Sequence, residues 1–331
     1  MVYIEVDLDK IVQNACAIKN NTNSELVAVV KANAYGCGIN NTVLALSEVT
    51  KNFAVANVYE SSQILRLLPS SNVLVLSSEH FNFYDQSATY TVCREEDLDY
   101  IYGKVNKVAI KLNTGMNRFG CNPNELEHLI CKARKLGFEV SDIYTHFCSL
   151  EKANEQFDIF ANAVFPYKNS AKLHCCASNC LDLSNKFYLD KVRCGLAIYG
   201  FGHNLVAPAV EVYTEIVKIN YVKKGESVGY GNYVAPKNMK IAVLSAGYAD
   251  GISLSKDLHF SINGKRCKVV NRPCMDATMV DITQLNCKVG DRAYILGDSI
   301  SMIDAERYNS SFAHQILTAF HTRAIRKYVK K

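Results

Sequence analysis

A single lysine, Lys31, closes the apolar run LVAVV (residues 26–30) and is followed by the turn-forming stretch ANAYGCG. A short run of β-branched and other apolar residues that ends at turn residues is typical of a buried parallel strand. Lys31 would then stand at the carboxyl end of that strand, where α/β folds place their chemistry. A lysine amine that is desolvated there can lose its proton and condense with an aldehyde; the alternative is a turn that carries a solvated lysine.

Further polar residues follow other expected strands, as the reacting groups of a barrel would: Tyr35, Arg118, His146, His174, Ser178 and Arg193. Barrels of this kind commonly bind phosphate over their seventh and eighth strands. Ser178 and the backbone N–H groups near Gly195 and Leu196 would be suitable donors there. These residues could together hold a phosphorylated aldehyde such as pyridoxal phosphate.

Eight apolar segments alternate with helix-like segments and predict the scaffold. The strands are expected near residues 26–30, 53–58, 73–76, 89–92, 107–112, 142–147, 172–176 and 191–194. The helices include residues 40–48, 60–68, 95–101 and 124–136, and Asp7 is expected to cap an earlier helix. Eight strands over about 190 residues predict a (β/α)₈ barrel, although a doubly wound sheet is the alternative.

The pattern changes after residue 205, where short β-rich stretches are joined by turns that contain glycine, among them the hairpin signal Asn263-Gly264. Only residues 311–320 there look helical. The sequence thus predicts a barrel domain over 1–205 and a β-rich domain over 206–331, with residues 2–6 as a strand that can join the second domain.

Composition excludes several classes of protein. The chain has 331 residues, 49% of them apolar and 21% charged, with a net charge of +5, which is ordinary for a globular protein. The C-terminal cations, Arg323 to Lys331, are expected to form a solvated tail rather than a nucleic-acid site. None of the thirteen cysteines forms a C-x-x-C metal or redox pair. Without a leader or a membrane span, a reducing cytoplasmic location is expected, with no metal.

Five motifs in the same order resemble those of bacterial alanine racemases: AVVKANAYGCG, KLNTGMNRFG, VRCGLAIYG, GYADG and RPCMDATMVDI. The resemblance runs nearly end to end and includes the division into a barrel and a β domain. It implies pyridoxal 5′-phosphate as cofactor and the interconversion of L- and D-alanine, with D-alanine going to peptidoglycan.

The resemblance also implies two catalytic bases, Lys31, which holds the cofactor covalently, and Tyr248 of GYADG, contributed by the second subunit of a head-to-tail homodimer. Two bases are needed because the proton leaves one face of Cα and returns to the other. Both side chains have solution pKa values near 10, so both pKa values must be lowered. Desolvation and cations would lower that of Lys31, and positive neighbours such as His146 and an arginine would lower that of Tyr248.

Other roles follow from the same resemblance. Arg118 would bind the substrate carboxylate with help from the backbone of Met275, and Lys111 matches a lysine that many family members carry as a carbamate, which orients that arginine. Arg193 would face the pyridine nitrogen, with His174 supporting it. The cofactor-binding residues would be Lys31, Tyr35, His146, His174, Ser178, Arg193, Gly195 and Leu196. Taken singly, the histidines could be core residues and Cys274-Met275-Asp276 an ordinary turn.

The chain departs from the family pattern in three places. Asn113 stands where an aspartate is usual, which leaves the support of Arg118 and the carbamate on Lys111 open. Ser178 and Asn179 are exchanged relative to the usual order, so either could bind the phosphate. Thr322 precedes Arg323 in place of a tyrosine or proline.

Two rival functions remain. A racemase of broader or different specificity would share all of these motifs, because the volume of the substrate pocket depends on how side chains pack. A non-catalytic barrel that binds pyridoxal phosphate would resemble only the first domain. The β domain with GYADG counts against this second rival.

Overall fold

The computed structural model describes residues 1–329 and divides the chain into two compact units. The barrel unit contains Lys10–Ala34 and Gly38–Ala207. The β unit contains Met1–Asp9, Tyr35–Cys37 and the chain from Pro208 on. The first residues and a three-residue piece of the lysine turn therefore group with the C-terminal part of the chain.

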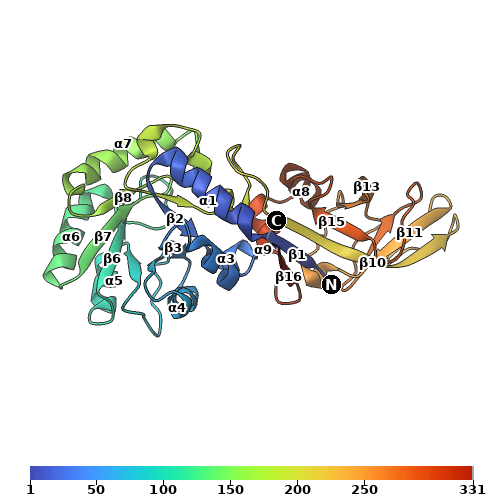
Figure 1. Ribbon diagram of the computed structural model, residues 1–331, viewed down its shortest axis with the longest axis horizontal. Coiled ribbons are helices and arrows are strands. Elements are labelled where there is room, and N and C mark those ends of the chain that lie inside the picture. The colour runs from blue at the N-terminus through green and yellow to red at the C-terminus, as the bar shows by residue number, and fades with distance from the viewer. Residues whose placement is uncertain (330–331) are drawn as a thin grey trace. The chain divides into compact units, whose positions relative to one another are not determined.

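Eight parallel strands build the barrel, in the spatial order β8-β7-β6-β5-β4-β3-β2-β9 (Figure 1). Their bounds are β2 Glu25–Val29, β3 Asn52–Val55, β4 Asn72–Val75, β5 Thr89–Val92, β6 Lys107–Lys111, β7 Glu139–Tyr144, β8 Lys172–His174 and β9 Lys191–Cys194. A bridge between Ala177 and Arg193 brings the two ends of this order together, so the sheet is nearly closed. The predicted (β/α)₈ class is confirmed, and the doubly wound alternative is wrong.

The strands form because each is a short run that is largely buried on both faces, as helices on the outside and side chains on the inside require. One boundary differs from the prediction. Strand β7 begins at Glu139 and ends at Tyr144, three residues earlier than expected, because the polar residues Ser141 and Asp142 are part of it. His146 consequently follows the strand instead of ending it.

Helices connect the strands: α1 Leu8–Thr22, α2 Lys31–Tyr35, α3 Ile39–Leu46, α4 Val58–Leu67, α5 Glu95–Ile101, α6 Leu126–Lys135 and α7 Ala153–Val164. Helix α4 begins at Asn57, whose side chain accepts hydrogen bonds from the amides of Tyr59 and Glu60 at 3.0 and 3.1 Å. Helix α6 buries the face that its spacing predicts, Leu126, Leu129, Ile130 and Ala133. No helix within residues 1–329 is long and apolar enough to cross a membrane.

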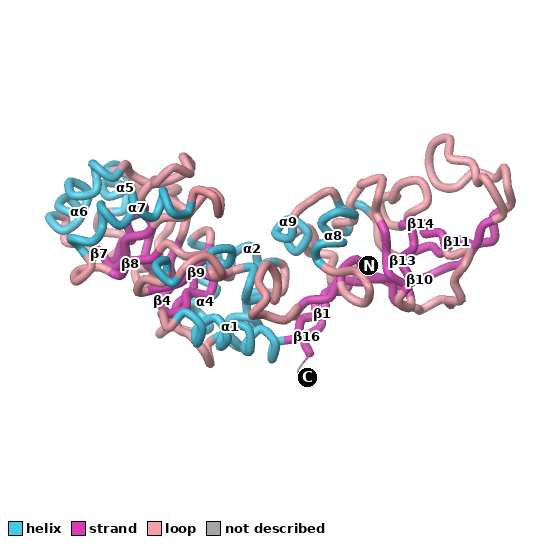
Figure 2. Tube along the Cα trace, turned by 90° about the horizontal axis from the view of Figure 1, so that it is seen from above, coloured by secondary structure: helices cyan, strands magenta, loops and turns pink. Residues whose placement is uncertain are grey.

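The β unit is organised around β10, Val210–Val222, which pairs with β1, β11 and β15 (Figure 2). Its other strands are β1 Tyr3–Asp7, β11 Met239–Leu244, β12 His259–Ile262, β13 Lys265–Lys268, β14 Thr278–Asp281, β15 Arg292–Leu296 and β16 Ile325–Val329. Asn263 and Gly264 both have positive φ and join β12 to β13, which is the geometry of a two-residue hairpin.

Two expectations for the C-terminal region are wrong. A second helix, α8 Met302–Asn309, precedes α9 Ala313–Thr318; its start is a capping box in which Ser301 and Asp304 bond reciprocally. The terminal cations are not simply solvated, since Arg326 donates to the Gly36 carbonyl at 2.6 Å and Lys327 to the Tyr213 hydroxyl at 3.1 Å. Lys330 and Lys331 lie outside the described residues.

Candidate active site

Lys31 begins a left-handed turn directly after β2. Ala32, Asn33, Ala34 and Tyr35 all have φ between 52° and 55°, a region that costs a residue with a side chain about 1–2 kcal/mol. The Asn33 side chain accepts the Ile39 amide at 2.8 Å, and Glu60 accepts the Ala32 amide at 2.6 Å. These bonds hold a backbone path that the sequence would not adopt alone.

The Lys31 amine has a lowered pKa. Burial is the main cause, the cation of Arg118 adds to it, and Glu60 opposes it. This is the direction expected from the sequence. It favours the neutral amine that a lysine needs to attack an aldehyde or take up a proton.

A second lysine, Lys111, lies in the same cationic group. It is only 6% exposed and has Phe119 and Tyr144 ring centroids 5.4 and 5.8 Å from its Nζ atom. Burial lowers its pKa to about 8; the Cys93 thiol opposes that shift, and the cations of Arg118, Arg193 and Lys31 add to it. The carbamate expected on this lysine is untested, although a neutral amine is the form that would react with carbon dioxide.

His146 is neutral near pH 7, which differs from the expectation that it acts as a positive neighbour. Burial first, and then the cations of Arg193, Lys111, Arg118 and Lys31, lower its pKa to about 3. An imidazole surrounded by four cations in a desolvated site cannot hold a further charge. The two arginines, Arg118 and Arg193, keep the surroundings of His146 positive whatever the charge of the nearby lysines, which suits an anionic ligand.

Arg118 is carried by the turn TGMNRFG, and Asn113 organises that turn. The Asn113 side-chain oxygen accepts the amides of Gly115 and Asn117 at 3.1 and 3.0 Å, and its NH₂ group donates to the Asn117 side chain at 2.8 Å. An amide thus organises the turn where an aspartate was expected from the resemblance.

Arg193 is buried on β9 with 4% of its surface exposed. Its guanidinium donates to His174 Nδ1 at 2.6 Å, to the His174 carbonyl at 3.1 Å and to the Thr145 carbonyl at 2.6 Å. It also lies over the Tyr144 ring, 4.9 Å from the centroid. Three fixed acceptors and one ring determine where this cation points.

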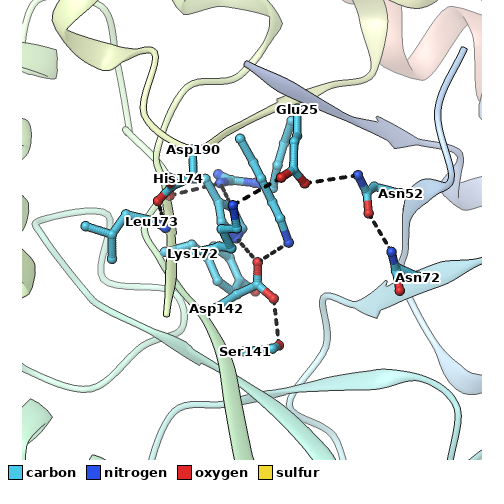
Figure 3. Close-up of polar contacts among 12 residues, drawn as sticks. Glu25, Asn52, Asn72, Ser141, Asp142, Lys172, Leu173, His174 and Asp190 are labelled. Atoms are coloured by element: carbon cyan, nitrogen blue, oxygen red, sulfur yellow. Dashed lines mark hydrogen bonds and ion pairs between the residues drawn. The ribbon is translucent and has the colours of Figure 1, made fainter. Parts of the chain in front are cut away.

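His174 is fully buried and stacks on Tyr144 with ring centroids 5.0 Å apart. Its Nε2 atom lies 3.2 Å from Asp142 Oδ1, out of line for a hydrogen bond, and Figure 3 shows the two side chains facing each other. Burial lowers the pKa of His174 to about 4, against the pull of Asp142. The ring is therefore neutral.

Ser178 lies at the start of the loop that follows β8. Its hydroxyl oxygen accepts the amides of Gly195 and Ala197 at 3.0 and 3.2 Å, which leaves the hydroxyl hydrogen to donate elsewhere. The Asn179 side chain accepts the Cys180 thiol at 3.4 Å. The structure thus brings Ser178 to the predicted Gly195–Leu196 segment, while Tyr35 groups with the β unit and packs against His314 with ring centroids 5.7 Å apart.

Tyr248 and Met275 belong to the β unit and lie on two turns that are bonded to each other. The Tyr248 amide donates to the Cys274 carbonyl and the Ala249 amide to the Met275 carbonyl, both at 3.0 Å. Any side chain on Gly247 would strike the Cys274 and Met275 carbonyls, so only glycine permits this approach. The Tyr248 side chain is 45% exposed.

Arg323 ties both turns together. Its guanidinium lies 2.9 Å from Asp276 and 3.5 Å from Asp250, and Asp250 accepts the Gly247 amide at 3.0 Å. Thr322 stands where the family often has a tyrosine, so any contact of that tyrosine is lost here or supplied elsewhere. The adjacent arginine supplies ionic contacts here.

Sequence reasoning missed Glu60, Asp142, Tyr144 and Lys191. The last three carried a usable signal, since Asp142 and Tyr144 on β7, and Lys191 and Arg193 on β9, are each two residues apart and so share a face of their strand. No signal in the sequence pointed to Glu60, because its role depends on a left-handed turn that residue propensities do not predict.

These features define a class of protein. It has a nearly closed barrel whose first strand is followed by a lysine of lowered pKa, two arginines that suit an anionic ligand, one of them held by three acceptors, and a separate β domain. Family comparisons then identify the chain. The model of the alanine racemase N-terminal domain matches residues 6–202, and that of the alanine racemase C-terminal domain matches residues 209–328. The chain belongs to the alanine racemase family.

Individual relatives agree with this assignment. Alanine racemase 2 of Caldanaerobacter subterraneus subsp. tengcongensis is 32% identical over 98% of this chain and 94% of its own length. The alanine racemase of Bacillus anthracis with bound L-Ala-P superposes with a TM-score of 0.90 at 25% identity, covering 100% of this chain and 95% of that one. The enzyme of Bartonella henselae with covalently bound pyridoxal phosphate gives a TM-score of 0.88 at 25% identity and covers 99% of each chain.

Proposed function

We propose that this protein is a pyridoxal-phosphate-dependent alanine racemase that uses Lys31 and Tyr248 as its two bases. The observation that carries the proposal is the setting of Lys31, a half-buried amine of lowered pKa that begins a fixed turn and lies near the cation of Arg118. Membership of the alanine racemase family supports it.

The donor set fits this cofactor. The aldehyde needs a neutral amine, for which Lys31 has the lowered pKa. The phosphate needs hydrogen-bond donors, for which the Ser178 hydroxyl, held by the Gly195 amide, and the Leu196 amide are suited, with Tyr35 as a further donor. The pyridine ring needs a partner for its nitrogen, for which Arg193 is fixed by His174.

When bound, pyridoxal phosphate withdraws electrons from the substrate and so acidifies its Cα–H bond. Lys31 removes or returns the proton on one face of Cα, and Tyr248 does so on the other. Arg118 binds the substrate carboxylate through both of its terminal nitrogens, with the Met275 backbone beside it. Arg193 keeps its proton and so donates a hydrogen bond to the ring nitrogen without transferring a full charge to it.

Tyr248 acts, in this proposal, across a homodimer, so that each site combines the barrel of one chain with the β unit of the other. The exposed position of the Tyr248 side chain supports a role toward a group outside its own unit. The protein would work in the cytoplasm and supply D-alanine for peptidoglycan.

An assay of D-alanine formation from L-alanine tests the reaction, together with the absorbance of purified protein. We expect turnover and a band at about 420 nm from lysine-bound cofactor. Absence of both would refute the proposal. The rival of different specificity is tested by kcat/KM for alanine, serine, lysine and arginine, and a preference for any of the last three over alanine would establish it.

A further inference from the structure

Beneath His174 lies a buried ion pair that the proposed reaction does not use directly. Lys191 Nζ is 2.5 Å from Asp142 Oδ1, and the two side chains are only 14% and 8% exposed. Ser141 donates to the other carboxylate oxygen at 2.7 Å, as Figure 3 shows. A buried ion pair is by itself a weak source of stability because both charges lose their water, so this one invites another explanation.

The hydrogen bond from Arg193 fixes the state of the histidine above this pair. A guanidinium can only donate, so His174 Nδ1 must present a lone pair to Arg193 at 2.6 Å. The proton of the neutral ring therefore sits on Nε2, which faces Asp142. A doubly protonated ring would turn an N–H toward Arg193 and break the contact that orients it.

Asp142 alone would favour that doubly protonated ring. A carboxylate about 4–6 Å or less from an imidazole stabilises its charged form. The charged and titratable groups that face His174 are Asp142 and Tyr144 on β7 and Lys191 and Arg193 on β9. Lys191 is the group among them that is paired with the carboxylate, so it cancels the charge that would attract a second proton.

We propose that Lys191 is a positioning residue that neutralises Asp142, so that His174 stays uncharged and holds Arg193 toward the cofactor ring. The inference rests on the proposed function, in which Arg193 meets the pyridine nitrogen, and adds two residues to that arrangement. Lys191 touches neither substrate nor cofactor in this arrangement and acts through Asp142, His174 and Arg193 in turn.

The first test measures the charge of His174 in the cofactor-free full chain by ¹⁵N NMR of labelled histidine between pH 4 and 8. In K191M the uncompensated carboxylate should raise the pKa of His174 by roughly 1–3 units. In D142N/K191M, which lacks both charges, the pKa should return toward its low value. The matched control is K107M, which removes an exposed lysine that pairs with Glu139 at 3.4 Å.

The second test measures the affinity of the same chains for pyridoxal phosphate at pH 6 and pH 8. For a pKa rise of about 2–3 units, K191M should bind about two- to tenfold more weakly at pH 6 and nearly normally at pH 8, while D142N/K191M and K107M stay close to wild type at both. An unshifted His174 titration in K191M overturns the inference, and so does an equal loss in the single and double variants. Folding of the double variant when K191M fails to fold supports it; failure of both overturns it.

The two readouts separate this inference from the proposed function. Suppose that the His174 titration shifts in K191M while the affinity of K191M for pyridoxal phosphate is unaltered at both pH values. The role of Lys191 in keeping His174 uncharged is then supported. The contact between Arg193 and the cofactor, which belongs to the proposed function, is then overturned.

Discussion

Glu60 accepts the Ala32 amide at 2.6 Å and thereby ties the residue after Lys31 to helix α4. Its other carboxylate oxygen accepts the Ala56 amide at 2.9 Å. The left-handed turn from Ala32 to Tyr35 carries a cost of about 1–2 kcal/mol for each residue, and such strain persists only where neighbouring groups hold it. The direction in which the Lys31 side chain leaves the barrel strand therefore depends on Glu60.

Replacing this carboxylate should change both the turn and the lysine. In E60Q only one oxygen remains for two amides, which should lower the free energy of unfolding by about 1–3 kcal/mol. Loss of the negative charge should also lower the pKa of Lys31 further, since Glu60 opposes the existing shift. The rate at which cofactor-free protein captures pyridoxal phosphate increases as Lys31 loses its proton. In E60Q this increase should occur at a lower pH than in the wild type. E96Q, on the exposed first turn of α5, is the control; an unchanged pH dependence in E60Q would exclude the role of Glu60.

Arg323 is expected to hold the turns of Tyr248 and Met275 in register through Asp276 and Asp250. R323Q should lower kcat/KM for alanine about twofold, because an ion pair whose two side chains are more than half exposed is screened by water and contributes little. D276N should lower it similarly, and the double variant should lose little more, since both changes remove one interaction. R307Q, which breaks an ion pair with Asp304 at 3.1 Å on α8, should leave kcat/KM unchanged. Full additivity of R323Q and D276N would contradict the coupling.

The phosphate contact can be assigned by comparing Ser178 with its neighbour. S178A leaves the Gly195 and Ala197 amides without their hydroxyl acceptor and removes a donor to the phosphate. Its affinity for pyridoxal phosphate should fall about tenfold, whereas N179A should change it little. Equilibrium titration of cofactor-free protein measures both. The reverse order of the two effects would assign the phosphate to Asn179.

Much of the scaffold was predictable because its signals are local. Each strand from β2 to β6 contains a short apolar run between polar turns, and even the brief strand Thr89–Val92 follows this pattern. Strand β7 was placed three residues late because the polar Ser141 stands before Asp142, where the predicted strand began, and the pairing of Asp142 with Lys191 involves a distant strand. Helix α8 was missed although Ser301 and Asp304 have the spacing of a capping box.

Candidate site residues could be named from the sequence, but their charge states could not. Lys31, Arg118 and Arg193 are visible in motifs, and the lowered pKa of Lys31 follows from burial that a strand end implies. The neutral state of His146 could not be predicted, because it results from burial and from cations on several strands that only the closed barrel brings together. The pair of Asp142 and Lys191 likewise joins residues 49 positions apart.

The neutral histidines predict a loss of stability in acid. His146 and His174 have folded pKa values of about 3 and 4, below the usual value of 6.5. A lowered folded pKa means that their contribution is complete above pH 6.5 and is lost as the pH falls toward 4, since the unfolded chain takes up protons first. Each should cost about 1.4 kcal/mol per pH unit well inside that window. Urea unfolding of cofactor-free H146Q should show about half the wild-type pH dependence between pH 6 and 4.5; an unchanged dependence would exclude a buried neutral His146.

The sharing of active sites between subunits can be tested with two inactive variants. K31A should lose lysine-bound cofactor, and Y248F should lose racemisation while keeping the band at about 420 nm. A borohydride-trappable cofactor on another lysine in K31A, or near-normal turnover in Y248F, would remove the corresponding residue from the mechanism.

Co-expressing these variants distinguishes a shared site from one within a single chain. If each site takes Lys31 from one subunit and Tyr248 from the other, a mixed dimer has one site with both bases intact and one with neither. With random pairing half of the dimers are mixed, so the preparation should recover about a quarter of the wild-type turnover. If both bases came from the same chain, every site in the mixture would lack one of them and no turnover would return. Mixing the separately purified homodimers without subunit exchange is the control, and it should remain inactive in either case.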